Sequence, residues 1–150
     1  MDLPKLKSKF KRLCISSDHA GYYLKEYIKD FIINSKISII DLGPFTDKSV
    51  DYPDFAKKVS NRVSKKKSDI GILVCGSGTG MAISANKTRG IRAVVGYNVK
   101  STQLSRQHNN ANILCLGSRL TKKKDIKKIV SIFLDTKFEG GRHQRRVKKI

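Results

Sequence analysis

Hydrophobic residues of this 150-residue chain occur in two patterns that alternate along the sequence. Short, almost continuously apolar runs are typical of strands in a parallel sheet covered on both faces; they lie at 12–16, 37–42, 69–75, 91–96 and 111–116. Between these runs, apolar residues recur every three or four positions, which is the period of an amphipathic helix. The predicted helices cover 22–34, 54–65, 79–86, 99–107 and 124–134.

The alternation of strand and helix predicts an α/β fold. We expect a single domain, a doubly wound, Rossmann-like three-layer sandwich with about five parallel strands. A last basic helix is expected after Gly140-Gly141. Ligands of doubly wound folds bind beyond the carboxyl ends of the strands. Polar or glycine-rich clusters follow the predicted strands at those ends: Asp18-His19, Asp51-Tyr52, 75–80 and Arg119.

The composition is strongly basic, with a formal net charge of +20. The lysines and arginines are scattered over predicted helix faces and both ends of the chain, which is typical of a solvated surface. A nucleic-acid-binding protein is the non-enzymatic alternative, but no nucleic-acid motif accompanies the charge, so we expect no such partner. No apolar stretch approaches the roughly 20 residues needed to cross a bilayer, and no signal-peptide core follows the N-terminus. We therefore expect a cytoplasmic protein that does not bind membranes.

Three cysteines occur, and they differ in their surroundings. Cys14 and Cys115 lie inside apolar runs and are predicted to be small buried hydrophobes. Cys75 ends a predicted strand and is followed by a glycine-rich loop. This pattern favours free thiols in a reducing compartment over a disulfide framework.

The most informative segment is Cys75-Gly76-Ser77-Gly78-Thr79-Gly80. Glycine at every second position lets the backbone approach an anion closely, and the helix that begins here directs its amide groups to the same point. Helix N-termini also favour the thiolate form of a neighbouring cysteine. The spacing matches neither a Walker loop nor the dinucleotide fingerprint, and a plain tight turn is the alternative. With Cys75 before it and Ser77 within it, the loop predicts an enzyme that acts on a small anionic molecule.

Three further clusters are candidates for the same chemistry. His19 could donate to a phosphate and Asp18 could bind substrate hydroxyls, because both follow the first strand. His108 could move a proton, because an imidazole is the side chain that most often acts as an acid or base in enzymes, although a capped loop is the alternative. Arg142 and Arg146 are four residues apart, so on a helix they would share a face and could clamp a phosphate. The alternative for these arginines is a solvated basic tail.

Seven motifs occur together in order along the chain. They are Ser17-Asp18-His19-Ala20-Gly21, Asp51-Tyr52-Pro53, the loop 75–80, Ala85-Asn86-Lys87 with Gly90-Ile91-Arg92-Ala93, the run 106–112, Leu116-Gly117-Ser118-Arg119, and the run 138–143. In this combination the chain resembles the sugar-phosphate isomerase family of type B ribose-5-phosphate isomerases, to which the lactose-pathway galactose-6-phosphate isomerase subunits also belong. The resemblance runs from residue 14 to residue 147. Residues 1–11 look like a basic extension of a domain that spans 12–150.

The resemblance implies an aldose–ketose isomerase that interconverts D-ribose 5-phosphate and D-ribulose 5-phosphate through a cis-enediolate, in the pentose phosphate pathway. Cys75 would be the base that moves a proton between C1 and C2, and His108 would open the furanose ring. The loop Gly76–Gly80 would stabilise the enediolate with its amide groups, and Ser77 stands where the family often has Thr. The other matched positions are Asp18, His19, Tyr52 and Asn109 as substrate contacts, and Arg119, Arg142 and Arg146 as phosphate contacts.

The same resemblance implies a homodimer or a dimer of dimers with active sites shared between chains, in which the stretch 108–119 serves the partner's site. It implies neither a metal ion nor an organic cofactor. Isomerases of six-carbon sugar phosphates, such as allose 6-phosphate or galactose 6-phosphate, are the alternative, because their site chemistry would be the same. The galactose enzymes need two different subunits. This chain carries the base, the histidine and the arginines together, which favours a self-sufficient homo-oligomer.

Overall fold

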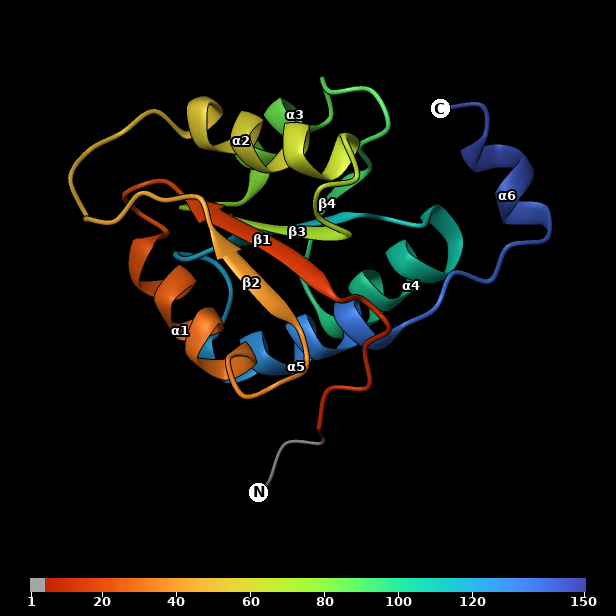
Figure 1. The fold of residues 1–150 in the computed structure, drawn as a ribbon, viewed down its shortest axis with the longest axis horizontal. Coiled ribbons are helices and arrows are strands. Elements are labelled where there is room, and N and C mark those ends of the chain that lie inside the picture. Colours follow the sequence, from red (N-terminus) through yellow and green to blue (C-terminus); the bar gives the residue numbers. More distant parts are fainter. Residues whose placement is uncertain (1–4) are drawn as a thin grey trace.

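The computed structural model describes residues 5–150 and confirms the predicted α/β sandwich (Figure 1). Strands and helices alternate along the whole chain, and a short last helix follows the glycine pair. The elements are β1 (Arg12–Ser17), α1 (Tyr22–Ile32), β2 (Ser38–Asp41), α2 (Tyr52–Ser64), β3 (Ile70–Cys75), α3 (Thr79–Ala85), β4 (Ala93–Val95), α4 (Val99–Asn109), β5 (Ile113–Gly117), α5 (Lys123–Asp135) and α6 (Arg142–Val147).

The five strands form one parallel sheet in the order β2-β1-β3-β5-β4. The register pairs Cys75, the last residue of β3, with Gly117, the last residue of β5. Parallel strands bring their carboxyl ends to one side of the sheet, here named the carboxyl edge, and their first residues to the amino edge. In Figure 1 the arrows of β1 and β3 point left toward the carboxyl edge, whereas α6 lies on the right.

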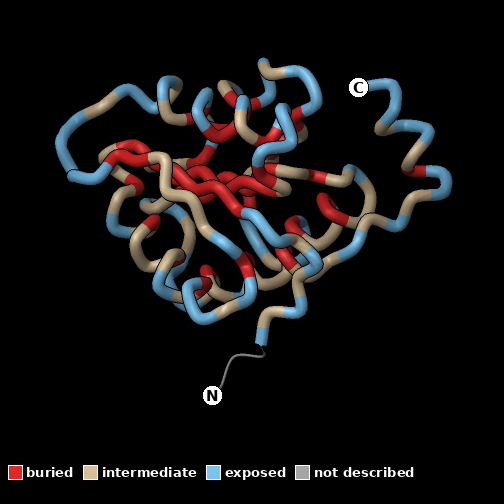
Figure 2. The backbone as a smooth tube through the Cα atoms, viewed as in Figure 1, coloured by how far each residue is buried: buried red, intermediate tan, exposed pale blue. Residues whose placement is uncertain are grey.

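Helices cover both faces of the sheet and give it three layers. α1, α4 and α5 lie on one face, and α2 and α3 lie on the other (Figure 1). Alternate strand residues supply the two cores, because neighbouring side chains of a strand point to opposite faces. Leu13 and Ile15 pack with α1 and α5, whereas Cys14 between them packs with α2. Figure 2 shows the buried segments concentrated in the strands, as expected for a sheet covered on both sides.

The start of α1 lies unusually close to the end of β3. A Cβ atom placed on Gly21 would lie 2.4 Å from the carbonyl oxygen of Val74, which is closer than any side chain allows. Glycine at this position therefore lets α1 begin directly against the carboxyl edge. The hydroxyl of Ser118 reaches the same turn and donates to Ala20 O at 2.8 Å. Three strand ends are thus held together at one point.

A buried ion pair joins α1 to β2 and to the loop that follows β2. Lys25 is fully buried, and its Nζ donates to Asp41 Oδ1 at 2.8 Å and to the carbonyl of Pro44 at 2.6 Å. Lys29 donates to the other Asp41 oxygen at 2.7 Å. Burial opposes ionisation of Asp41, but the two lysine hydrogen bonds outweigh it and hold the pKa of this carboxyl below its usual value. The pair therefore fixes the loop after β2 at the carboxyl edge.

The expected basic extension, residues 1–11, lies partly outside the described residues, at 1–4. Within 5–11, Leu6 and Phe10 pack against the core between the sheet and α5. The backbone amide of Lys7 donates to Asp135 Oδ1 at 3.0 Å. This part of the extension therefore lies along the domain. Among the helices described, none is long and apolar enough to cross a bilayer.

Candidate active site

A pocket of about 290 Å³ opens at the carboxyl edge, where the sequence predicts the site. Residues that follow four different elements meet in it, although they are far apart in the chain. Its lining is Asp18, Tyr52, Cys75, Gly76, Ser77, Gly80, Arg119 and Leu120. Seven of these eight residues were predicted from the sequence, and Leu120 was not.

Cys75 lines this pocket with only 4% of its surface exposed. The amide of Gly78 donates to its sulfur over 3.1 Å. Gly78 has φ of +81°, a left-handed conformation that glycine adopts without strain. A backbone N–H directed at sulfur stabilises negative charge on that atom. The glycine loop thus provides the cysteine with a fixed hydrogen-bond donor.

The same loop offers further amide groups to the pocket. The Thr79 amide donates to Ser77 Oγ at 3.3 Å. Within residues 5–150, the amides of Gly76 and Ser77 donate to no protein acceptor. Both residues line the pocket beside Cys75. These two N–H groups are therefore available to a bound anionic oxygen.

The other two cysteines are in surroundings that oppose ionisation. Burial raises the pKa of Cys14 to about 11, although nearby polar groups act in the opposite direction. Burial and the neighbouring Cys75 also raise the pKa of Cys115, which is fully buried. All three thiols are free. Of the three cysteines, Cys75 is the one that lines the pocket.

Asp18 and Tyr52 form the side of the pocket nearest α1 and α2. Asp18 is 7% exposed, and its Oδ1 accepts from the amide of Gly21 at 3.0 Å, which fixes the carboxylate at the start of α1. The ring of Tyr52 passes across Gly80, where a Cβ atom would lie 2.8 Å from the ring. Tyr52 can approach α3 this closely because residue 80 has no side chain. Neighbouring backbone therefore fixes the position of both the Asp18 carboxylate and the Tyr52 ring.

Arg119 lies in the pocket of its own chain. Its amide donates to Gly76 O at 3.0 Å, and a Cβ atom on Gly76 would lie 3.1 Å from Arg119 Nη1. The expectation that the whole stretch 108–119 serves a partner's site is therefore wrong for Arg119. The reason is that β5 carries the chain across the sheet between His108 and Arg119, so the two ends of the stretch reach opposite edges.

His19, Gly78 and Thr79 lie beside this pocket but do not line it. His19 is half-buried, and its Nδ1 lies 3.2 Å from both the amide nitrogen and the carbonyl oxygen of Val50. The tautomer of the ring decides which of these two groups forms the hydrogen bond. His19 is therefore anchored to the loop that precedes α2.

The remaining predicted residues lie at the amino edge. His108 and Asn109 end α4, and Arg142 and Arg146 belong to α6. The strand β5 separates this end of α4 from the pocket, and its five residues span about 13 Å at 3.3 Å per residue. Arg142 and Arg146 are both exposed. Within one chain, the predicted site residues therefore form two separate groups, one at each edge of the sheet.

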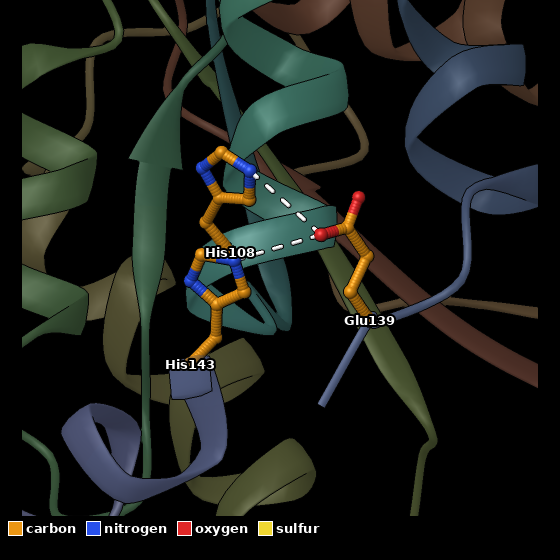
Figure 3. A group of neighbouring side chains, drawn as sticks. All are labelled: His108, Glu139 and His143. Atoms are coloured by element: carbon orange, nitrogen blue, oxygen red, sulfur yellow. Dashed lines mark ion pairs between the residues drawn. The ribbon is translucent and has the colours of Figure 1, made fainter. Parts of the chain in front are cut away.

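His108 has two close neighbours that the sequence did not predict as site residues (Figure 3). The His143 ring stacks on it with centroids 4.2 Å apart and planes at 11°. Glu139 Oε2 lies 4.0 Å from His108 Nε2 and 3.5 Å from His143 Nε2. Desolvation and the positive groups nearby, His108 and Arg142 first among them, lower the pKa of His143. The three side chains thus lie together at the amino edge.

Comparison with known proteins identifies the family. Residues 13–150 match the Ribose/Galactose Isomerase family. This chain belongs to the ribose/galactose isomerase family. Among its relatives, the probable ribose-5-phosphate isomerase B of Mycoplasma genitalium is 46% identical over 138 residues, which cover 91% of each chain. The ribose-5-phosphate isomerase B of Escherichia coli is 43% identical over 140 residues, covering 93% of this chain and 94% of that protein.

Solved structures of the ribose/galactose isomerase family have the same fold. The ribose-5-phosphate isomerase B of Clostridium thermocellum superposes with a TM-score of 0.90 at 46% identity, covering 92% of this chain and 93% of the other. The Mycoplasma genitalium enzyme with bound ribulose-5-phosphate gives a TM-score of 0.88 at 45% identity, covering 92% of each chain. The predicted resemblance and fold class are therefore both confirmed.

Two residues of this ribose/galactose isomerase chain, Glu139 and His143, lie beside His108 but were not predicted as site residues. They are four residues apart around Gly140-Gly141 and follow the run that contains His108 at a distance of some thirty residues. Nothing in a single sequence, however, shows that α4 and the glycine turn lie side by side. The amide of Glu139 donates to Gln107 O at 3.1 Å, and this bond makes the contact.

Proposed function

We propose that this protein interconverts D-ribose 5-phosphate and D-ribulose 5-phosphate. One observation carries the proposal: a cysteine sulfur that accepts from the Gly78 amide lies beside the unpaired amides of Gly76 and Ser77 in one pocket. Moving a hydrogen between two neighbouring carbons requires a base and a stabiliser for the oxygen anion that forms between the two proton transfers. The relatives named as ribose-5-phosphate isomerase B support the choice of substrate.

In this mechanism the Cys75 thiolate removes the proton from C2 of the open-chain aldose. The electron pair of that C–H bond forms the C1–C2 double bond, and the former carbonyl oxygen on C1 becomes the enediolate oxygen. The amides of Gly76 and Ser77 stabilise this oxygen, and each such donor is typically worth about 10²–10³ in rate. The proton of the C2 hydroxyl then passes to the C1 oxygen, which becomes the C1 hydroxyl. As the C2 carbonyl forms, the electron pair of the C1–C2 double bond takes the proton back from the Cys75 thiol at C1, and the thiolate is restored. No redox cofactor is needed, because the oxidation of C2 balances the reduction of C1.

The complete site in this proposal is formed by two copies of the chain. His108 is assigned the opening of the furanose ring, and Arg142 and Arg146 are assigned the phosphate, together with Arg119 from the chain that supplies Cys75. His108, Arg142 and Arg146 lie at the amino edge, which is separated from the pocket by the length of β5. A homodimer that apposes the carboxyl edge of one chain and the amino edge of its partner would unite them. Asn109, beside His108, would then join Asp18, His19 and Tyr52 around the sugar.

We place the protein in the cytoplasm and its reaction in the pentose phosphate pathway. Three free cysteines among the described residues fit a reducing compartment. The pathway assignment follows from the two substrates, which are the aldose and ketose forms of the pentose phosphate itself.

A cysteine substitution tests the proposed function. We expect purified Cys75→Ala to lose about 10²–10⁴ of kcat for ribose 5-phosphate, which is the usual contribution of a positioned base. Cys14→Ala is the matched control and should retain wild-type kcat, because Cys14 is buried in β1 and does not line the pocket. Full activity of Cys75→Ala would refute the mechanism. Comparing kcat/KM for ribose 5-phosphate with that for allose 6-phosphate and galactose 6-phosphate decides the length of the sugar.

A further inference from the structure

The side chain of His108 converges at the amino edge with those of Glu139 and His143, to which the proposed chemistry assigns no role (Figure 3). They come from the last turn of α4, from the segment before α6 and from the first turn of α6. One potential ligand atom of each, a ring nitrogen of both histidines and a carboxylate oxygen, belongs to a set whose members all lie within 4.8 Å of one another. Figure 3 shows both imidazole nitrogens directed at the same carboxylate oxygen.

The distances fit a small divalent cation. Zn²⁺ binds histidine nitrogen and carboxylate oxygen at about 2.0–2.2 Å, so two ligands of a tetrahedral ion lie about 3.4 Å apart. The observed separations from Glu139 Oε2 are 3.5 Å to His143 Nε2 and 4.0 Å to His108 Nε2. Neither is a hydrogen bond, because such bonds are about 2.7–3.2 Å long. The three atoms are thus spaced for an ion between them rather than for a shared proton.

The backbone holds the ligands in this arrangement. Gly140 and Gly141 have φ of +68° and +52°, values that side-chain-bearing residues rarely adopt, and they turn the chain so that Glu139 and His143 point to the same place. The Glu139 amide is fixed to α4 by its bond to Gln107 O. His143 is mostly buried, at 11% exposure of its side chain, whereas His108 and Glu139 are 37% and 49% exposed. One ligand is therefore preformed, and the other two can tilt toward an ion that arrives from solvent.

We propose that His108, Glu139 and His143 form a binding site for Zn²⁺ or a similar divalent transition metal ion, and that this ion inhibits the isomerase. The inhibitory part rests on the proposed function. Coordination uses the lone pair of His108 Nε2, which is then unable to exchange a proton with the sugar ring. Two histidines and one carboxylate leave the fourth position of the ion to water. The arginines of α6 lie close by and repel the cation, so binding strengthens when salt screens them.

Titration calorimetry with zinc chloride tests the site without reference to activity. The Cys75→Ala chain is used, because it lacks the thiol that would otherwise compete for zinc. We expect one Zn²⁺ to bind per chain. Adding Glu139→Gln or His143→Gln should weaken the zinc affinity by at least roughly 10- to 100-fold, because even the loss of a residue that only supports a metal ligand has an effect of that size. Glu26→Gln is the matched control, because Glu26 is the other glutamate of the chain and lies on α1. The proposed site would be refuted if Cys75→Ala bound no zinc, or if the Glu139→Gln and His143→Gln variants bound it as tightly as Cys75→Ala itself.

The isomerase assay tests the inhibitory part on proteins that retain Cys75. We expect zinc to inhibit the wild-type protein and Glu26→Gln at the same concentration, and a chelator to restore the rate. Glu139→Gln, compared with its own metal-free rate, should need at least about tenfold more zinc. Equal sensitivity of Glu139→Gln would refute inhibition through this site. If no preparation isomerises ribose 5-phosphate, the proposed function fails, while the calorimetry still decides the metal site.

Discussion

The two edges of the sheet differ in how completely one chain builds them. At the carboxyl edge, Cys75 and Asp18 are buried and each accepts a hydrogen bond from a backbone amide. At the amino edge, Arg142 and Arg146 are exposed, and neither forms an ion pair within residues 5–150. The groups that need an accurate position are thus fixed by the fold, whereas the groups that bind charge are held out to solvent. The proposed two-chain site requires this difference, because a second chain would bring its exposed arginines to the pocket that the first chain has already formed.

Subunit mixing is the strongest test of this comparison. Cys75→Ala and His108→Ala should each retain about a thousandth of wild-type kcat, because each lacks a proton-transfer group. When the two are unfolded together and refolded, half of the dimers are mixed and contain one intact site of two, so activity should recover to about a quarter of wild type. The initial rate on ribose 5-phosphate measures this roughly 250-fold gain.

The control is each variant refolded alone, which should stay inactive. No recovery in a mixture whose size-exclusion profile matches the wild-type protein would show that both residues serve the same chain. The structure would then have to bring α4 to the carboxyl edge by a rearrangement within one chain.

The buried lysine tests whether the carboxyl edge is rigid by construction. Lys25→Met should lower the free energy of unfolding by about 3 kcal/mol, because it leaves Asp41 partly uncompensated in the interior and frees the carbonyl of Pro44. Lys29→Met is the matched control and should cost about 1 kcal/mol or less, since Lys29 is partly exposed. Urea denaturation followed by circular dichroism measures both. Equal losses would show that burial of Lys25 has no special role.

The sequence predicts the carboxyl edge well because its signals are local. The run that ends at Cys75 and the glycines after it specify a strand, a tight turn and a helix without reference to distant residues. Once the strands are known to be parallel, their carboxyl ends must meet, so Asp18 and Arg119 follow. The positions of the strands and helices along the chain were predicted to within a few residues for the same reason, since continuous apolar runs and three-to-four-residue spacing depend only on neighbours. The order of the strands in the sheet was not predicted, because it depends on contacts between distant residues.

The amino edge shows what a single sequence leaves open. The stacking of His143 on His108 depends on how α6 returns to α4, and no periodicity encodes that contact. Lys25 was not predicted to be buried, because a lysine on an amphipathic helix is normally solvated and its partners, Asp41 and Pro44, come from another strand and loop. Arg119 was assigned to the partner's site, although its own chain supplies it to the pocket, because the stretch 108–119 was treated as one unit.

The arginines of α6 should affect binding rather than folding. Arg142→Ala and Arg146→Ala each remove a charged hydrogen-bond donor worth about 1.5–3 kcal/mol, which corresponds to a roughly 10- to 100-fold rise in KM for ribose 5-phosphate. Arg145→Ala, on the same helix and equally exposed, is the matched control and should leave KM unchanged. The melting temperature should stay the same in all three because these side chains are exposed. A KM effect as large in Arg145→Ala would mean that α6 contributes only diffuse charge.

Diffuse charge is itself the smallest effect that the comparison predicts. The chain carries a net charge of +20, and a phosphorylated substrate should be drawn to it before it reaches either edge. We expect kcat/KM of the wild-type protein to fall about two- to threefold between low and high salt. In the variant Lys65→Gln/Lys66→Gln/Lys67→Gln, which removes three exposed lysines at the end of α2, the fall should be smaller. That variant should show a flatter salt dependence with the same kcat. Identical salt profiles would show that this lysine group plays no part in attracting the substrate, and that the arginines at the two edges account for the whole electrostatic contribution.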